Sequence, residues 1–293
     1  MKVVSKPVFF EKGCAAALGT FDGVHLGHKS VISAAVESSF APVAIIIMQN
    51  GRKKRLFSDS LNLSYIESLG IDTAVCLDLD EICGMQPHEY LSMLYRQMNV
   101  RFFACGSNHR FGKAAAGTFD DISAFCEEHR IDCKKADTVT VNGVPVSSTA
   151  VRECVSCGDM ESARELMGHD YKIDFPVVHG DSRGREMGFP TINQPYPDGF
   201  VLPKFGVYAA VAEIDGEEYP AVSNVGIRPT YLAETPLAET HLIGYSGDLY
   251  GKGVTVAFKQ FMRPERKFDS PVELISAIAD DKSECMKILS GRK

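Results

Sequence analysis

The sequence has no apolar run long enough to cross a membrane. No stretch reaches about 18 consecutive apolar residues, the length that predicts a membrane-spanning helix. The amino-terminal residues MKVVSKPVFFEKG lack the apolar core and the small-residue cleavage site of a signal peptide. Internal repeats and low-complexity segments are also missing. We therefore expect a cytoplasmic protein with no membrane partner.

Positive charge and paired cysteines are scarce as well. The 293 residues include 31 lysines and arginines against 38 acidic residues, a formal net charge of -7, so we expect no nucleic-acid partner. The nine cysteines are scattered, which is typical of a reducing compartment. Cys154 and Cys157 form one Cys-x-x-Cys pattern. Two thiols on a helix face are the simpler interpretation, and zinc or redox chemistry is the alternative.

The first half of the chain alternates apolar and amphipathic segments. Short apolar runs that suit buried parallel strands occur at 15–19, 42–48, 73–77 and 101–106. Segments with helical spacing of apolar residues follow them at 26–39, 61–70, 87–99 and 119–130. This alternation predicts an α/β domain with a doubly wound parallel sheet, which we expect to span residues 1–153.

The organisation of the chain changes near residue 170. Asn142-Gly143 predicts a tight hairpin turn, and two short helices, ended by Gly158 and Gly168, are expected to form the connector at 154–168. Residues 169–293 are rich in strands, with a second hairpin at Asp215-Gly216. Ser270-Pro271-Val272-Glu273 combines a capping box with a proline at the first helical position. We expect a small β-barrel domain with a terminal helix.

The stretch LGTFDGVHLGH places two histidines between a predicted strand and the helix that follows it. The carboxyl ends of parallel strands bind ligands, and a helix amino terminus favours phosphate. His25 and His28 can donate hydrogen bonds to phosphate oxygens, and Gly27 lets the backbone approach closely. Nucleotidyl transfer requires such fixed donors together with magnesium. The alternative is that the histidines only pack against the helix or cap it.

The segment SSTAVR, residues 147–152, predicts a second phosphate contact. Its hydroxyls stand at a helix start, and Arg152 follows one turn later, where a guanidinium can grip a phosphate through two hydrogen bonds. A simple capping cluster is the alternative. Its pairing with the two histidines in one α/β domain favours phosphate binding.

These motifs resemble a known family. GTFDGVHLGH, SSTAVR and GDMESARELMGHDY are similar to the amino-terminal half of bacterial bifunctional riboflavin kinase/FAD synthetases. The second half resembles the riboflavin kinase pattern in order, through HGDSRGREMGFPTIN, FGVYAAV, SNVGIRPTY, ETHLIGYSGDLYG and RPERKFDSPVELISAI. The resemblance implies a nucleotidyltransferase domain that makes FAD from FMN and a barrel that makes FMN from riboflavin. It also implies Mg²⁺ as cofactor and ATP as co-substrate.

Individual roles follow from the resemblance. Glu239 matches the base that accepts the proton of the riboflavin 5′-hydroxyl; a solvated surface glutamate is the alternative. Thr191 and Asn193 alternate to one side of an extended segment and match the magnesium ligands. Arg263 matches a flavin-binding position; an ordinary exposed arginine is the alternative. The kinase positions matching ATP contacts are Gly184, Gly188, Thr191 and Asn193.

In the first domain His25 and His28 match catalytic positions. The ATP contacts there are Thr20, Phe21, Gly27, Asn108, Ser148, Thr149 and Arg152.

Part of the first domain departs from the family pattern. Residues 48–57, MQNGRKKRLF, replace the usual Phe-x-Pro-His-Pro, and the basic run 52–55 suits either phosphate binding or a solvated loop. Thr20 replaces an asparagine and His109 an aromatic residue. Two enzymatic functions therefore stay open: a bifunctional enzyme, and a riboflavin kinase with a degenerate adenylyltransferase domain. A flavin-binding regulator is a third alternative.

Overall fold

The computed structural model describes residues 1–48, 54–179, 189–229 and 234–291. Tertiary contacts divide the chain into two compact units. The first comprises Met1–Lys54 and Asp59–Ser148, and the second comprises Arg55–Ser58 and Thr149–Lys293. The expected domain limits, with a boundary at 153 and a connector at 154–168, stay predictions. No helix in the described part of the chain is long and apolar enough to cross a bilayer.

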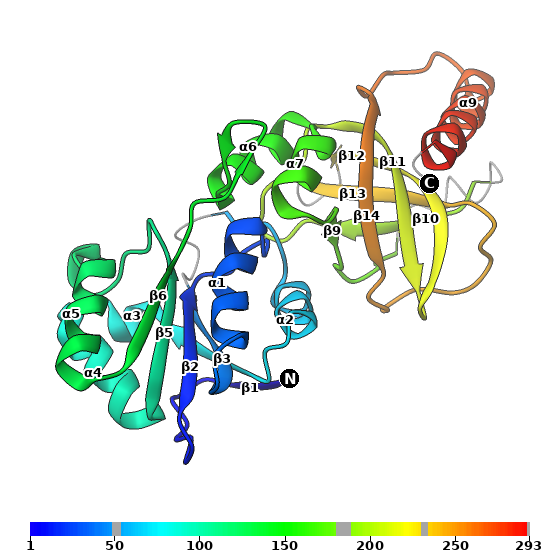
Figure 1. The fold of residues 1–293 in the computed structure, drawn as a ribbon. Coiled ribbons are helices and arrows are strands. Elements are labelled where there is room, and N and C mark those ends of the chain that lie inside the picture. The colour runs from blue at the N-terminus through cyan, green and yellow to red at the C-terminus, as the bar shows by residue number, and fades with distance from the viewer. Residues whose placement is uncertain (49–53, 180–188, 230–233, 292–293) are drawn as a thin grey trace. The chain divides into compact units, whose positions relative to one another are not determined.

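A six-stranded parallel sheet forms the centre of the first unit (Figure 1). In spatial order its strands are β1 (Lys2–Val4), β4 (Thr73–Asp78), β3 (Ala41–Met48), β2 (Cys14–Gly19), β5 (Val100–Gly106) and β6 (Asp132–Ala136). From β2 the chain adds β3 and β4 on one side, then β5 and β6 on the other. The winding therefore reverses beside β2, and in such sheets this point binds ligands at the carboxyl ends of the strands.

Helices cover both faces of this sheet. The helices of the unit are α1 (Leu26–Val36), α2 (Asp59–Ser68), α3 (Leu79–Ile82), α4 (Pro87–Met98) and α5 (Phe119–His129), with a 3-10 turn at Lys113–Ala115. Alternate residues of β2 point to opposite faces. Ala15 and Ala17 pack with Ile32 of α1, whereas Ala16 packs in the core that contains Leu91 of α4. The predicted doubly wound sheet is confirmed.

The two edge strands were not predicted from the sequence. β1 has only three residues and pairs in parallel with β4, and β6 pairs in parallel with β5. In β6 only the last residue, Ala136, is buried, and the others include Asp132, Lys134 and Lys135. An edge strand that is largely exposed carries no apolar run, so its pattern does not stand out from a loop.

The hairpin and helices between the two halves follow the sequence. β7 (Thr140–Val141) and β8 (Val144–Pro145) flank Asn142 and Gly143, whose φ values of 51° and 79° match the predicted turn. The helices α6 (Ser148–Cys157) and α7 (Met160–Met167) come next. Gly158 and Gly168 end them with φ values of 81° and 71°.

An antiparallel half-barrel forms the second unit. In spatial order its strands are β10 (Thr191–Pro195), β13 (Glu234–Leu242), β12 (Glu217–Pro229), β11 (Gly206–Ile214), β14 (Thr255–Arg263) and β9 (Tyr171–Ile173). Tyr171, Tyr208 and Phe258 are fully buried, and the Phe258 ring contacts the rings of both tyrosines. After β9 the chain reaches the far edge of the sheet, where Val178 forms a bridge with Asn193.

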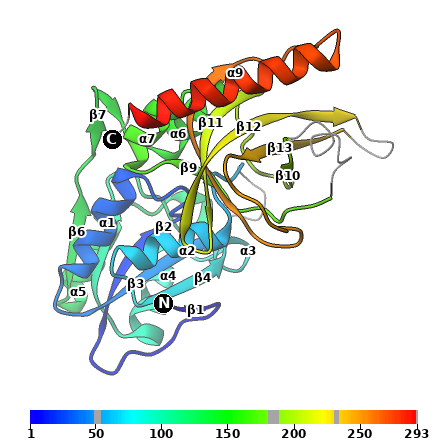
Figure 2. The ribbon, with the colours of Figure 1, turned by 90° about the vertical axis from the view of Figure 1, so that its right-hand side faces the viewer.

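The terminal helix α9 (Pro271–Ser290) packs on the outer face of β11 and β12 (Figure 2). Its Cys285 is buried with Val207, Ala209 and Val222 of these strands. The helix begins as the sequence predicts, because the Ser270 hydroxyl accepts the Glu273 N–H at 3.2 Å and Pro271 is the first helical residue.

Candidate active sites

The loop between β2 and α1 leaves the carboxyl end of the central strand in an uncommon conformation. Phe21, Gly23 and Val24 have φ values of 49°, 78° and 32°. Two of these residues carry side chains, for which positive φ costs on the order of 1–3 kcal/mol each. Phe21 and Val24 are fully buried in the core between the sheet and α1. Their packing offsets the backbone strain and holds the loop in one shape.

Two hydrogen bonds anchor this loop from outside. The side-chain oxygen of Asn62, on α2, accepts the Gly23 N–H at 2.9 Å. The Ser148 hydroxyl, at the start of α6, donates to the Asp22 carbonyl at 3.3 Å. The sequence predicts Ser148 but not Asn62. The available signal was an asparagine in a helix interior, where its propensity is low.

His25 caps α1, so one of its two ring nitrogens is assigned. Its Nδ1 accepts the backbone N–H of His28 at 3.2 Å. The accepting nitrogen carries no proton, which places the proton of the neutral ring on Nε2. His25 therefore caps the helix, and its role towards phosphate stays a prediction. Capping is also compatible with phosphate binding, because it sets the tautomer that donates from Nε2.

The two histidine rings lie against each other. Their centroids are 3.6 Å apart with planes inclined by 13°, and Phe21 meets the His28 ring edge-on at 5.3 Å. A Cβ on Gly27 would lie 3.2 Å from the His25 ring. Any larger residue at this position would therefore crowd the ring.

The loop after β5 leaves the sheet beside the histidine loop. β2 and β5 are paired neighbours, with Leu18 opposite Cys105, and Asn108 is exposed two residues beyond the end of β5. The structure therefore brings Thr20 and Asn108 to the same edge of the sheet. Burial lowers the pKa of the following His109 to about 4, so its ring is neutral at pH 7.

The α6 segment is divided between the two units. Ser148 belongs to the first unit and contacts the histidine loop, as described above. Thr149 and Arg152 belong to the second unit, in the first turns of the same helix. Their expected contacts with ATP stay predictions.

A second group of polar residues forms a row across three strands of the half-barrel. Asn193 of β10 lies opposite Glu239 of β13, and Glu239 lies opposite Asn224 of β12. Residues directly opposite in antiparallel strands point to the same face. Thr191 is two residues from Asn193 and shares that face, as the sequence predicts.

Asn193 offers a buried oxygen in this row. The residue is 6% exposed, and its Oδ1 has no hydrogen-bond partner among the described residues. Leaving a buried polar atom unpaired costs about 1–3 kcal/mol, so such an atom points to a ligand. The Asn193 amide, the Thr191 hydroxyl and the neighbouring Glu239 carboxylate are hard oxygen donors. This donor set fits Mg²⁺.

Asn224 extends the row and was not predicted. Its Nδ2 donates to Oε1 of Glu265 at 3.0 Å, which connects β12 to the segment after β14. The available signal was an asparagine within a strand, a position where asparagine is depleted. Ser223 and Thr240, the neighbours of Asn224 and Glu239 in sequence, point to the opposite face of the sheet. Both are fully buried, and their hydroxyls share a hydrogen bond of 2.9 Å.

Two predicted regions fall partly or wholly outside the described residues. Gly184 and Gly188 lie there, as do Arg52 and Lys53 of the basic run. Arg55 lies within the described residues and pairs through its backbone: its N–H donates to the Gly199 carbonyl at 2.7 Å, and its carbonyl accepts the Val201 N–H at 2.8 Å. The backbone of Arg55 is therefore paired within the second unit, and both interpretations of the basic side chains stay open.

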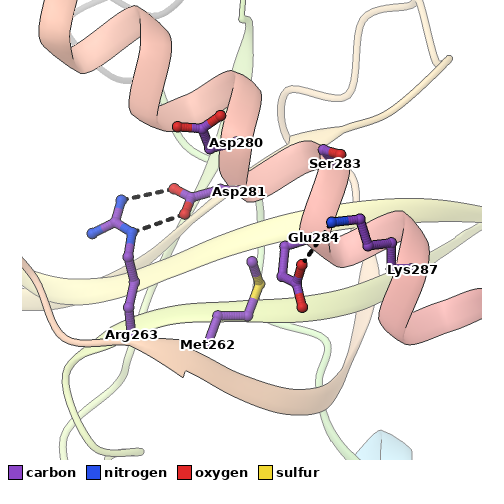
Figure 3. A pocket seen from close by; sticks show the side chains of 7 residues that line it. All are labelled: Met262, Arg263, Asp280, Asp281, Ser283, Glu284 and Lys287. Carbon is purple, nitrogen blue, oxygen red and sulfur yellow. Dashed lines mark hydrogen bonds and ion pairs between the residues drawn. The ribbon is translucent and has the colours of Figure 1, made fainter.

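Arg263 is tied to the terminal helix. Its Nε and Nη2 donate to the two carboxylate oxygens of Asp281 at 2.8 and 2.7 Å (Figure 3). The ordinary exposed arginine considered from the sequence is wrong, because this side chain is 25% exposed and makes a two-point ion pair. The pair borders a surface hollow of about 290 Å³, lined by Met262, Arg263, Asp280, Asp281, Ser283, Glu284 and Lys287. Carboxylates outnumber cations there, which disfavours a phosphate ligand.

We expect Arg263→Gln to lower the free energy of unfolding by about 1–3 kcal/mol. The substitution leaves the Asp281 carboxylate, which is 9% exposed, without two charged hydrogen bonds. Urea-induced unfolding followed by circular dichroism measures the change. Lys287→Gln is the matched control, because its ion pair with Glu284 joins two largely exposed side chains and contributes at most about 1 kcal/mol. Equal effects of the two substitutions would contradict the structural role of Arg263.

Comparisons with known proteins divide the chain in the same way as the fold. The family model described as FAD synthetase matches residues 9–150, and the model described as riboflavin kinase matches residues 167–289. The first match contains the histidine loop. The second contains the row of Asn193, Glu239 and Asn224.

Similar proteins align along almost the whole chain. The bifunctional riboflavin kinase/FMN adenylyltransferase of Bacillus subtilis (strain 168) is 30% identical, over 94% of this chain and 92% of its own length. The protein of the same description from Escherichia coli (strain K12) is 32% identical, over 92% and 91%. A crystal structure from Streptococcus pneumoniae, described as a macrolide-efflux protein, has a TM-score of 0.87 and 22% identity, covering 97% of this chain and 98% of that one. That likeness is one of fold alone.

Proposed function

Because the chain belongs to the bifunctional riboflavin kinase/FMN adenylyltransferase family, we propose that it converts riboflavin to FMN and FMN to FAD, using one ATP in each step. The observation that carries the kinase half concerns Asn193, which lies directly opposite Glu239: its buried side-chain oxygen has no partner in the described part of the chain. It supports a site in which a cation and a carboxylate act on neighbouring atoms. Both family regions are present in the chain, which supports two activities rather than one.

In the proposed kinase step, Glu239 accepts the proton of the 5′-hydroxyl of riboflavin. The oxygen forms a bond to the γ-phosphorus of ATP, the bond from that phosphorus to the bridging oxygen breaks, and ADP leaves. Thr191 and Asn193 would hold Mg²⁺, which supplies positive charge to the transferring phosphate when bound. Asn224 lies beside Glu239 in the row, where its amide is fixed by Glu265.

In the proposed adenylyl step, a phosphate oxygen of FMN attacks the α-phosphorus of ATP and pyrophosphate leaves. No protein nucleophile is needed, so the residues act by positioning and by donating hydrogen bonds. His25 donates from Nε2, since its Nδ1 is occupied as the helix cap. His28 adds a second imidazole 3.6 Å away, and the amino terminus of α1 favours the negative charge. Thr20, Asn108, Thr149 and Arg152 are the proposed further ATP contacts.

A kinase with an inactive first domain is the second candidate. It is favoured by residues 48–57, which depart from the motif that the family usually has there. Two of them, Leu56 and Phe57, are each 1% exposed and belong to the second unit. Against it, the histidine loop is held by buried packing and by Asn62, as a working site requires. The bifunctional enzyme is therefore the better supported function.

Product analysis tests this proposal. Purified full-length protein is incubated with riboflavin, ATP and magnesium, and the flavins are separated by chromatography. We expect FMN and FAD in amounts above that of the protein. A parallel reaction with FMN and ATP is assayed for pyrophosphate, and its absence would leave the kinase-only function. Failure to turn over riboflavin would contradict both enzymatic functions and favour a flavin-binding regulator.

A further inference from the structure

We propose that His88, Glu128 and His129 form a binding site for a zinc ion on the surface of the first unit. His88 is the second residue of α4, and Glu128 and His129 are the last two residues of α5. These helices cover the face of the sheet opposite to α1, so the site is separate from the histidine loop. It lies outside the residues assigned to either proposed reaction.

The ligand atoms already converge. Nε2 of His88 is 3.5 Å from Oε2 of Glu128, and Nε2 of His129 is 3.8 Å from Oε1 of the same carboxylate. All three residues offer one ligand atom within 4.8 Å of the others. In a tetrahedral zinc site with bonds of about 2.0–2.2 Å, ligand atoms are about 3.3–3.5 Å apart. Small side-chain rotations therefore suffice to close the site.

A neighbouring hydroxyl supports the metal-binding form of His88. Nδ1 of His88 lies 3.4 Å from the Ser92 hydroxyl, one helical turn along α4. When Nδ1–H donates to this hydroxyl, the lone pair of Nε2 is left on the side of Glu128. A polar group that fixes the tautomer of a ligating histidine in this way is a regular feature of zinc sites.

Ring packing orients the second histidine. His129 stacks on Tyr95 with centroids 4.6 Å apart and planes inclined by 26°, and it contacts Phe125 at 4.3 Å. Its side chain is 24% exposed, whereas those of His88 and Glu128 are about 60% exposed. His129 is thus already held in place, which limits the side-chain entropy lost when an ion binds. The other two ligands are accessible to an ion from solvent.

The donor set selects the class of ion. Two imidazole nitrogens and one carboxylate are the ligands of several three-residue zinc sites, with water in the fourth position. Magnesium and calcium prefer oxygen ligands only, so they do not compete for this set. Bound zinc would join the start of α4 to the end of α5 and stabilise the folded first unit by mass action.

Zinc titration of the full-length protein tests the proposal. Metal-free protein under reducing conditions competes for ZnCl₂ with a chromophoric chelator. The wild type and Glu127→Gln are expected to bind one ion each with equal affinity, since Glu127 is exposed beside Glu128 but outside the cluster. His88→Gln and Glu128→Gln are expected to weaken binding at least about tenfold. Both replaced side chains are exposed, so the variants should fold.

Cobalt replaces zinc to identify the ligands, because the chain also contains nine free cysteines. The expected Co²⁺ spectrum shows visible ligand-field bands without a thiolate charge-transfer band. Three results would overturn the proposal: no zinc binding by the wild type, equal binding by His88→Gln and Glu127→Gln, or a thiolate band that persists in His88→Gln. The first result would show that the cluster binds no zinc, and the other two would assign the bound metal to other residues.

Discussion

Glu239→Gln is expected to lower the rate of FMN formation by about 10²–10⁴-fold, the contribution typical of a general base. Glutamine keeps the size of the side chain but cannot accept the proton of the riboflavin hydroxyl. The strand register stays intact, because Glu239 is held opposite Asn193 and Asn224 by backbone pairing. FAD formation from supplied FMN is expected to continue at the wild-type rate. Chromatography of flavins after separate incubations measures both reactions.

The matched control is Glu213→Gln. Glu213 is an exposed glutamate on β11 of the same sheet and lies outside the row. It is expected to leave both activities unchanged. If Glu239→Gln retained full FMN formation, Glu239 would be the solvated surface glutamate that the sequence also allowed. If both activities fell together in a folded protein, the division of the two reactions between the two domains would be wrong.

His28→Ala is expected to lower the rate of FAD formation from FMN by about 10²–10³-fold, the cost of losing one fixed hydrogen-bond donor to a transition state. FMN formation from riboflavin is expected to persist, because the kinase residues belong to the other unit. Release of pyrophosphate measures the first reaction, and chromatography of FMN measures the second. Ser33→Ala, at an exposed position on α1, is the control for effects of a change in this helix.

His25→Ala distinguishes capping from catalysis. His25 accepts the His28 N–H at the start of α1, so its loss is expected to destabilise the fold by about 0.5–2 kcal/mol in addition to slowing FAD formation. The N-cap of α1 is His25, so His28→Ala should change the thermal unfolding midpoint less than His25→Ala. Unchanged FAD formation in His28→Ala would remove the catalytic role of the histidine loop.

The central strands and both hairpins were predictable because their signals are local. A buried parallel strand needs a continuous apolar run, and a two-residue turn needs residues such as Asn142-Gly143 that tolerate positive φ. The edge strands β1 and β6 were not predictable for the same reason. β6 is mostly exposed, and only its pairing with β5 makes it a strand.

The candidate sites divide in the same way. The motifs around His25 and His28, and around Thr191 and Asn193, were visible in the sequence as residue types at a given spacing. Asn62 and Asn224 were not visible in this way. Asn62 bonds to Gly23, 39 residues away in the sequence, and Asn224 bonds to Glu265, 41 residues away. Two residues that meet only in the folded chain form no motif with a fixed spacing in the sequence.

Local patterns along the chain were enough to indicate the family, the order of the two folds and the residue types available for phosphate chemistry. Three contacts became visible only in the folded chain: His25 caps α1, Arg263 pairs with Asp281, and Asn193 lies opposite Glu239. Each of these contacts requires a particular backbone geometry or strand register. Such geometry follows from the packing of many residues together and is not encoded in any one segment.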